Sequence, residues 1–272
     1  MPLWLYDLPN WQLGMLITGG LVALGLGGHT VFQQFCRITF PESDRNLAIA
    51  LMAVVATVNS LLLAFSAISV WDAFGAADRA VSGEATTVGE LSRDLAAFDT
   101  PQSLQAGVRL AAYARAVVDD EWAAMRMDQP SPTTWIDFDL MFDAVAKIEP
   151  ATARETALMP EIWARANELV KYRRARLDAS KGRVPGTLWA VVLVGTLLTI
   201  MPSFVLPRRP FNRAGIAMLS LSMGLVLFFI AALDRPFVGK ESISDEPFRE
   251  YLHSATNASE NAVASTAAAP RR

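Results

Sequence analysis

Four long stretches of the sequence contain no charged side chain, and each is long enough to cross a lipid bilayer. They lie between Asp7 and Arg37, from Asn46 to Trp71, between Arg183 and Arg208, and from Ala214 to Leu233. Because a helix rises about 1.5 Å per residue, about 20 apolar residues cover a hydrocarbon core of about 30 Å. The pattern predicts an all-α integral membrane protein with four transmembrane helices.

Composition excludes several other classes of protein. Of the 272 residues, 52% are apolar and 19% are charged, whereas about a quarter of a soluble domain is charged. One cysteine and two histidines provide neither a disulfide nor a zinc site of the usual Cys/His kind. The net charge of -3 argues against nucleic acid as a partner. The sequence contains no recognisable catalytic or nucleotide-binding motif, so we expect no enzyme activity, no cofactor and no metal.

The centres of the predicted spans contain only neutral polar residues. Proton-driven pumps commonly have ionisable groups at membrane depth, so this class is disfavoured. Asn59 and Ser66 are seven residues apart and therefore share one face of the second span. They line a hydrophilic pathway in one interpretation. In the interpretation that we favour, they form hydrogen bonds with a neighbouring helix or with their own backbone.

Small residues recur every four positions in the first span, at Gly19, Ala23 and Gly27. They share a helix face on which another helix could approach closely. The alternative, which we favour, is that they fill space within the protomer.

A charged, alanine-rich region separates the second and third spans and is predicted to be helical. Helices are expected at about 68–98, 101–127, 133–148 and 151–182, with Thr100 as an N-cap before Pro101. We therefore predict a helical-bundle domain inserted between the second and third transmembrane helices. The predicted parts are 1–71 (spans one and two), 72–183 (the bundle), 184–239 (spans three and four) and 240–272, with disorder after about residue 254.

Two charged clusters in this region have both a structural and a functional interpretation. The run Asp119, Asp120 and Glu121 is interpreted as a solvated acidic face that pairs with the last helix, because successive helical residues cannot converge on one ion. A basic cluster ends the last helix, where cations near a helix C-terminus and lipid phosphates are favourable. Alternatively, it forms an electropositive collar at a pore mouth. The collar candidates are Arg173, Arg174, Arg176, Lys181 and Arg183.

Loop charges suggest a membrane orientation. With four spans, both termini and the bundle lie on one side, and the two short loops lie on the other. Both short loops contain arginines, so the positive-inside rule places them in the cytoplasm and the bundle in the periplasm of a Gram-negative cell. This prediction localises the chain to the inner membrane, with the lipid bilayer as its first partner. Labelling of Cys36 by an impermeant maleimide in intact cells would overturn the predicted orientation.

Several short motifs, in their order and spacing, resemble the bestrophin-like domain family of bacterial membrane proteins. The resemblance covers about residues 45–250. Its signature residues are Trp71, Glu84, Tyr113, Glu121, Trp122, Asp234, Pro236, Phe237 and Gly239, and further matches lie at Arg173, Arg176, Pro185, Trp189 and 243–248. The resemblance implies four spans with a helical insertion after the second. Bestrophins themselves are oligomeric anion channels whose corresponding helical region is cytosolic, which conflicts with the orientation predicted from loop charges.

Two functional hypotheses follow. In the first, the chain is a homo-oligomeric ion channel that prefers anions, with Asn59, Phe65 and Ser66 lining the pore and the basic cluster near its mouth. In the second, it is a non-conducting membrane scaffold or sensor whose helical domain binds a protein partner. The residues alone do not choose between them.

Overall fold

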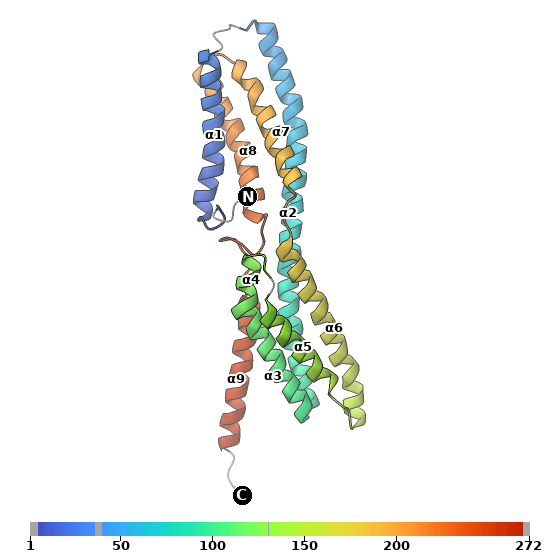
Figure 1. The fold of residues 1–272 in the computed structure, drawn as a ribbon. Helices are drawn as coiled ribbons and strands as arrows, with labels where there is room; N and C mark the ends of the chain where they lie inside the picture. The colour runs from blue at the N-terminus through green and yellow to red at the C-terminus, as the bar shows by residue number, and fades with distance from the viewer. Residues whose placement is uncertain (1–4, 36–39, 130, 269–272) are drawn as a thin grey trace. The chain divides into compact units, whose positions relative to one another are not determined.

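The computed structural model describes residues 5–35, 40–129 and 131–268, and all regular secondary structure in these ranges is helical (Figure 1). The chain divides into two compact units, each described here by itself. Unit 1 comprises residues 1–74 and 182–242, and unit 2 comprises residues 75–181 and 243–272. Of the predicted C-terminal segment 240–272, residues 240–242 fall in unit 1 and the rest in unit 2.

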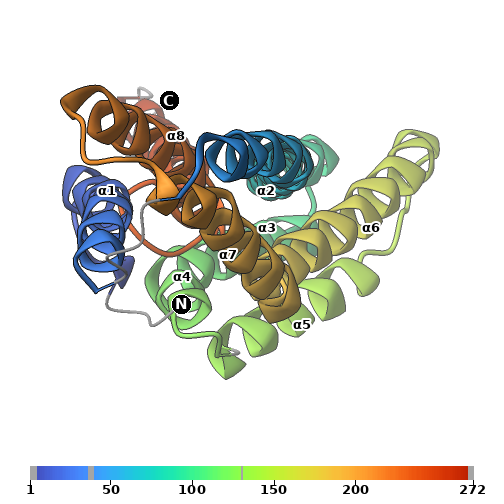
Figure 2. The ribbon, with the colours of Figure 1, turned by 90° about the horizontal axis from the view of Figure 1, so that it is seen from above.

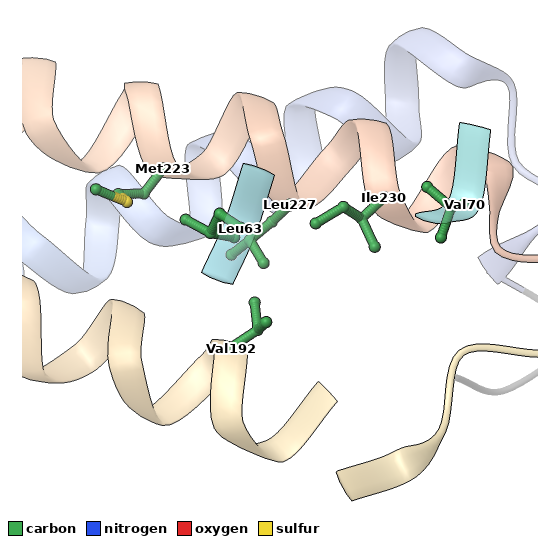
Figure 3. Close-up of a cluster of buried hydrophobic side chains, with 6 residues drawn as sticks. All are labelled: Leu63, Val70, Val192, Met223, Leu227 and Ile230. Carbon is green, nitrogen blue, oxygen red and sulfur yellow. The ribbon is translucent and has the colours of Figure 1, made fainter. Parts of the chain in front are cut away.

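Four helices are long and apolar enough to cross a membrane, as the uncharged stretches predict. They are α1 (Asn10–Phe35), α2 (Glu42–Phe98), α7 with its 3-10 extension η3 (Gly186–Ile200, then Met201–Val205) and α8 (Pro210–Leu233). Within unit 1, α1 and α8 pack side by side along much of their length, and α7 contacts α8 (Figures 1 and 2). An apolar cluster joins α2, α7 and α8 through Leu63, Val70, Val192, Met223, Leu227 and Ile230 (Figure 3).

Unit 2 contains the C-terminal part of α2 and the remaining helices. These are α3 (Pro101–Ala116), the π-helix η2 (Val117–Glu121), α4 (Trp122–Arg126), α5 (Pro132–Ala146), α6 (Ala153–Lys181) and α9 (Glu246–Ala268). The side chain of Thr100 caps α3 by accepting from the Ser103 backbone, with Pro101 at the first turn, as predicted. Ser131 caps α5 in the same way through the backbone of Thr134.

Two predictions about these elements are corrected. The expected single helix at 101–127 is interrupted by the π-helical turn of η2. The tail is helical to Ala268 rather than disordered after about residue 254. Alanine has the highest helix propensity of all residues, which favours helix in this Ala-rich segment in spite of its few large apolar side chains.

Candidate functional site

Two arginines and two glutamates form a fully buried ion-pair network inside unit 2. Arg176 of α6 contacts Glu84 of α2 through two nitrogens, at 2.6 and 3.0 Å, and Glu121 of η2 at 2.6 Å. Arg173, one turn earlier on α6, donates to the other oxygen of Glu121 at 2.8 Å. The hydroxyl of Tyr113 on α3 donates to Glu84. The network thus connects α2, α3, η2 and α6.

The π-helical turn directs Glu121 into this network. The backbone N–H of Trp122 donates to the Val117 carbonyl, five residues back, so the turn is wider than an α-helical turn. As a result Glu121 is buried, whereas Asp119 and Asp120 remain exposed. The predicted pairing of the acidic run with the last helix is therefore confirmed for Glu121. The prediction that Glu121 lies on a solvated face is wrong, because the turn rotates it inward.

Aromatic rings cover the parts of both guanidinium groups that the carboxylates leave free. The Cζ atom of Arg173 lies 4.5 Å from the centroid of the Trp135 ring and 4.7 Å from that of Phe138. That of Arg176 lies 5.7 Å from the Trp122 ring. The Nε and Nη1 atoms of Arg173 have no hydrogen-bond acceptor among the described residues. The ring faces attract this cation in place of an acceptor.

The electrostatics of the network favour a structural role over proton transfer. Burial and the adjacent charge of Glu84 raise the pKa of Tyr113 well above its usual value. Burial alone would lower the pKa of Arg176, but the charge of Glu84, its hydrogen bonds to Arg176 and the charge of Glu121 together outweigh this and hold that pKa well above its usual value. The two carboxylates and two guanidiniums balance in formal charge, and their hydrogen bonds connect four elements of unit 2.

Burial also corrects the prediction of an electropositive collar. Arg173 and Arg176 are 1% and 0% exposed and paired with carboxylates, so they do not offer free charge to a pore mouth. Arg174 and Lys181 are exposed, as is Arg183, which has interactions of its own. The cluster therefore contains two classes of cation, because only one face of α6 lies against the core of unit 2.

A pattern in the sequence could have identified the network. On α2, Ala77, Val81, Val88 and Leu91 are buried at alternating spacings of three and four, and Glu84 occupies the one remaining position of this series. Arg173 and Arg176 continue the series Ile162, Ala166 and Leu169 on α6. Charges of opposite sign at core positions of two helices indicate a buried pair.

Asp234, at the C-terminal end of α8, connects three segments of unit 1. One carboxylate oxygen accepts from the Tyr6 hydroxyl at 2.8 Å, and the other accepts from the Val184 backbone at 2.7 Å. The guanidinium of Arg235 lies 5.6 Å from the Tyr6 ring centroid. Asp234 therefore holds the segment before α1, the segment before α7 and the end of α8 together.

The other signature residues at the ends of the spans are also structural. Pro236 and Phe237 are buried. Gly239 has a φ of +99°, and a Cβ there would lie 3.0 Å from the Tyr6 carbonyl oxygen, so glycine is required by both conformation and space. The exposed ring of Trp71 stacks on Phe229 with 6.3 Å between their centroids.

The three pore-lining candidates do not share one face of α2. Asn59 and Ser66 are buried among the helices of unit 1, whereas Phe65 is 62% exposed. Ser66 donates to the Leu62 carbonyl of its own helix, and a Cβ on Gly195 of α7 would lie 2.2 Å from Asn59 Oδ1. The prediction that all three line one pathway is therefore corrected, because the shared face of Asn59 and Ser66 packs against α7 and α8.

The positions of the small residues of α1 differ from the favoured prediction, in which they fill space within the protomer. Gly19, Ala23 and Gly27 are exposed, and a Cβ on either glycine would meet no atom within 4 Å. Other residues of α1 make the close contact with α8: Thr18 approaches Gly224, and Gly25 approaches Ser220. The face of Gly19, Ala23 and Gly27 thus does not fill space within the protomer.

The described residues contain no group of three or more His, Cys, Asp or Glu side chains placed to hold a metal ion. Cys36 lies outside them.

The comparisons with known proteins identify the family of this chain. A model of the Bestrophin-like domain matches residues 19–248. Neither the curated proteins nor the solved structures gave a match. With four apolar helices of membrane-spanning length and a family match over most of its length, the chain is a membrane protein of the bestrophin-like family.

Proposed function

We propose that the chain assembles with copies of itself into an ion-conducting oligomer that prefers anions. The observation that carries this proposal is the outward face of α2. Exposed apolar residues recur along it at alternating spacings of four and three, the spacing of helices that pack in bundles. They are Leu47, Leu51, Val54, Val58, Leu61, Phe65 and Ile68, named here the outer α2 face.

In the proposed assembly, the outer α2 faces of several copies surround a common axis. A passage lined by such residues is apolar, and apolar constrictions can gate by losing their water. Phe65 remains a pore-lining candidate, whereas Asn59 and Ser66 support the lining helix from behind. The exposed face of Gly19, Ala23 and Gly27 permits close approach of a neighbouring subunit to α1.

The preference for anions rests on the family and on exposed cations of α6. Of the five collar candidates, Arg174 and Lys181 supply charge most directly, because both are exposed. In a symmetric oligomer each would be repeated around the axis and would concentrate anions near the pore mouth.

Single-channel recording from the purified protein in planar bilayers tests conduction. We expect discrete current steps, with a reversal potential under a salt gradient that reports anion preference. Phe65→Ala should change the unit conductance. Phe35→Ala on α1, also highly exposed, is the matched control and should not. Silent bilayers with folded, inserted protein would contradict the proposal.

A second candidate is the non-conducting scaffold or sensor. It is supported by exposed apolar side chains in unit 2, of which Val108 on α3 and Ile136 on α5 are the most exposed on their helices. This candidate predicts that planar bilayers show no current. It also predicts that a protein partner can be cross-linked to unit 2, and that Val108→Glu abolishes this cross-link.

The proposed orientation places the short loops in the cytoplasm and the helical insertion between the second and third spans in the periplasm of a bacterial inner membrane. The arginines at 208, 209 and 213 support it by the positive-inside rule. Cys36 in intact cells should resist an impermeant maleimide and react after permeabilisation. Labelling of Cys36 before permeabilisation would show that the chain has the opposite orientation.

A further inference from the structure

A pocket of about 530 Å³ with a mixed polar and apolar lining lies in unit 1 where α1 approaches its C-terminal end and α8 begins. This end of unit 1 includes the loop between η3 and α8. The lining residues are Leu26, His29, Thr30, Arg208, Pro210, Arg213, Ala214 and Ala217. The pocket plays no part in the proposed passage along the outer α2 face.

The pocket is positively charged. Arg208 and Arg213 are both exposed, and neither has a carboxylate within ion-pair distance in the part of the chain that the structure describes. Arg208 donates to the Thr30 carbonyl, which positions its guanidinium beside α1. The N-cap residue of α8, Arg209, makes no side-chain capping hydrogen bond. The positive end of the α8 dipole therefore adds to the charge of the two arginines.

His29 provides an independent indication of a ligand. Its side chain is fully buried, and its Nε2 atom lies 2.9 Å from the Leu206 carbonyl oxygen. Because a carbonyl only accepts, Nε2 carries a proton. Nδ1 has no hydrogen-bond partner among the described residues, and such a buried, unpaired atom is costly. With the proton on Nε2, Nδ1 is an acceptor, and a ligand hydroxyl is a group that would satisfy it.

The surroundings of the pocket indicate a lipid rather than a soluble ligand. Both walls belong to helices of membrane-spanning length. Next to the lining residues, Val31, Phe211 and Met218 expose large apolar side chains on which acyl chains can lie. Basic pockets between transmembrane helices commonly bind anionic head groups.

We propose that this pocket binds an anionic phospholipid whose head group contains a hydroxyl, such as phosphatidylglycerol. Arg208, Arg213 and the start of α8 contact the phosphate, and Nδ1 of His29 accepts from the head-group hydroxyl. The proposal does not depend on ion conduction.

Lipid enrichment in reconstituted protein tests this proposal. The full chain is inserted into nanodiscs of phosphatidylglycerol and phosphatidylcholine, and the lipids that remain bound are counted by native mass spectrometry. We expect phosphatidylglycerol to be enriched on the wild-type protein. The double variant Arg208→Ala/Arg213→Ala should lose this enrichment by about tenfold or more.

Matched variants separate the pocket from general charge. Arg209→Ala removes an exposed arginine from the same loop that does not line the pocket, and it should keep the enrichment. The double variant Arg208→Lys/Arg213→Lys keeps the positive charge and should retain most of the phosphatidylglycerol enrichment. His29→Leu should weaken binding of phosphatidylglycerol more than that of phosphatidic acid, which lacks the head-group hydroxyl.

Two results would overturn the proposal. One is equal enrichment in wild type and in the alanine double variant, with unchanged helix content by circular dichroism. The other is complete displacement of phosphatidylglycerol by millimolar inorganic phosphate, which would assign the pocket to a soluble phosphate compound.

Discussion

Arg176 is the residue whose loss unit 2 should tolerate least. It is completely buried and contacts the carboxylates of Glu84 and Glu121, which come from different helices. Arg176→Met keeps much of the volume but leaves Glu84 with an uncompensated charge, and Glu121 with Arg173 as its one remaining cationic partner among the described residues. Breaking a buried pair in this way destabilises by about 3 to 5 kcal/mol. Chemical unfolding of the purified protein, followed by circular dichroism, should therefore show an earlier loss of helix.

Arg174→Met is the matched control, because Arg174 is two residues away on the exposed face of α6. Its effect should stay within about 0.5 kcal/mol. Equal stability of the two variants would show that the network does not hold unit 2 together.

Tyr113 should make unit 2 sensitive to alkaline pH. Burial and the charge of Glu84 raise its pKa in the folded state well above the value near 10 of an unfolded chain. The unfolded state therefore loses this proton first, so the contribution to stability is complete below pH 10 and falls as the pH rises above it. The unfolding midpoint of the wild type should drop between pH 9 and pH 11.

Tyr113→Phe removes the ionisable hydroxyl and should reduce that drop, with the loss of a hydrogen bond to a carboxylate worth about 1.5 to 3 kcal/mol at neutral pH. Tyr6 and Tyr251 also have raised pKa values, so some alkaline sensitivity should remain. An identical pH profile for the variant and the wild type would contradict the assignment.

At the scale of elements, Gly224 is the glycine at which the backbones of α1 and α8 approach each other. A Cβ on Gly224 would lie 2.8 Å from the Cα atom of Thr18, and backbone cannot move aside as a flexible side chain can. Gly224→Ala should therefore separate the two helices and cost about 1 to 3 kcal/mol. The same substitution at Gly215, on the same helix, meets no atom within 4 Å and should be neutral or slightly stabilising. Thermal unfolding in detergent compares the two variants.

The helical elements could be predicted from the sequence where their signals are local. An uncharged run marks each of the four apolar helices, and Thr100 with Pro101 marks the start of α3. The π-turn at Val117–Glu121 could not be predicted in this way, because the contacts of Glu121 with α6 that accompany it are tertiary. The composition of the tail predicts disorder, whereas the high helix propensity of alanine favours the helix found at Glu246–Ala268.

The buried network could be predicted only in part. Glu84, Tyr113 and Glu121 were identified as signature residues, and Arg173 and Arg176 as cations, but not as partners of one another. Cations near the end of a helix usually remain in solvent, and this general expectation outweighed their position in the apolar series of α6. Which faces of α2 and α6 meet is a property of tertiary packing, which a single sequence does not display.

At the scale of the whole molecule, α2 has two apolar faces but only one is covered within the chain. Asn59, Leu63, Ser66 and Val70 form the covered face. The outer α2 face is open, although its side chains repeat with equal regularity. Lipid alone could cover it, because hydrocarbon chains are as apolar as leucine. Self-association requires that the outer α2 faces of two copies lie close together, and cross-linking at defined positions tests this.

Single cysteines on the two faces of α2 should behave differently. In a Cys36→Ser background, which removes the one native cysteine, Leu61→Cys places a thiol on the outer α2 face. Leu63→Cys, two residues further, places one on the covered face. With a short bis-maleimide in reconstituted membranes, Leu61→Cys should give covalent dimers and Leu63→Cys should not. Met218→Cys, exposed on α8, measures random collision, and cross-linking there as efficient as at Leu61→Cys would reject assembly through α2.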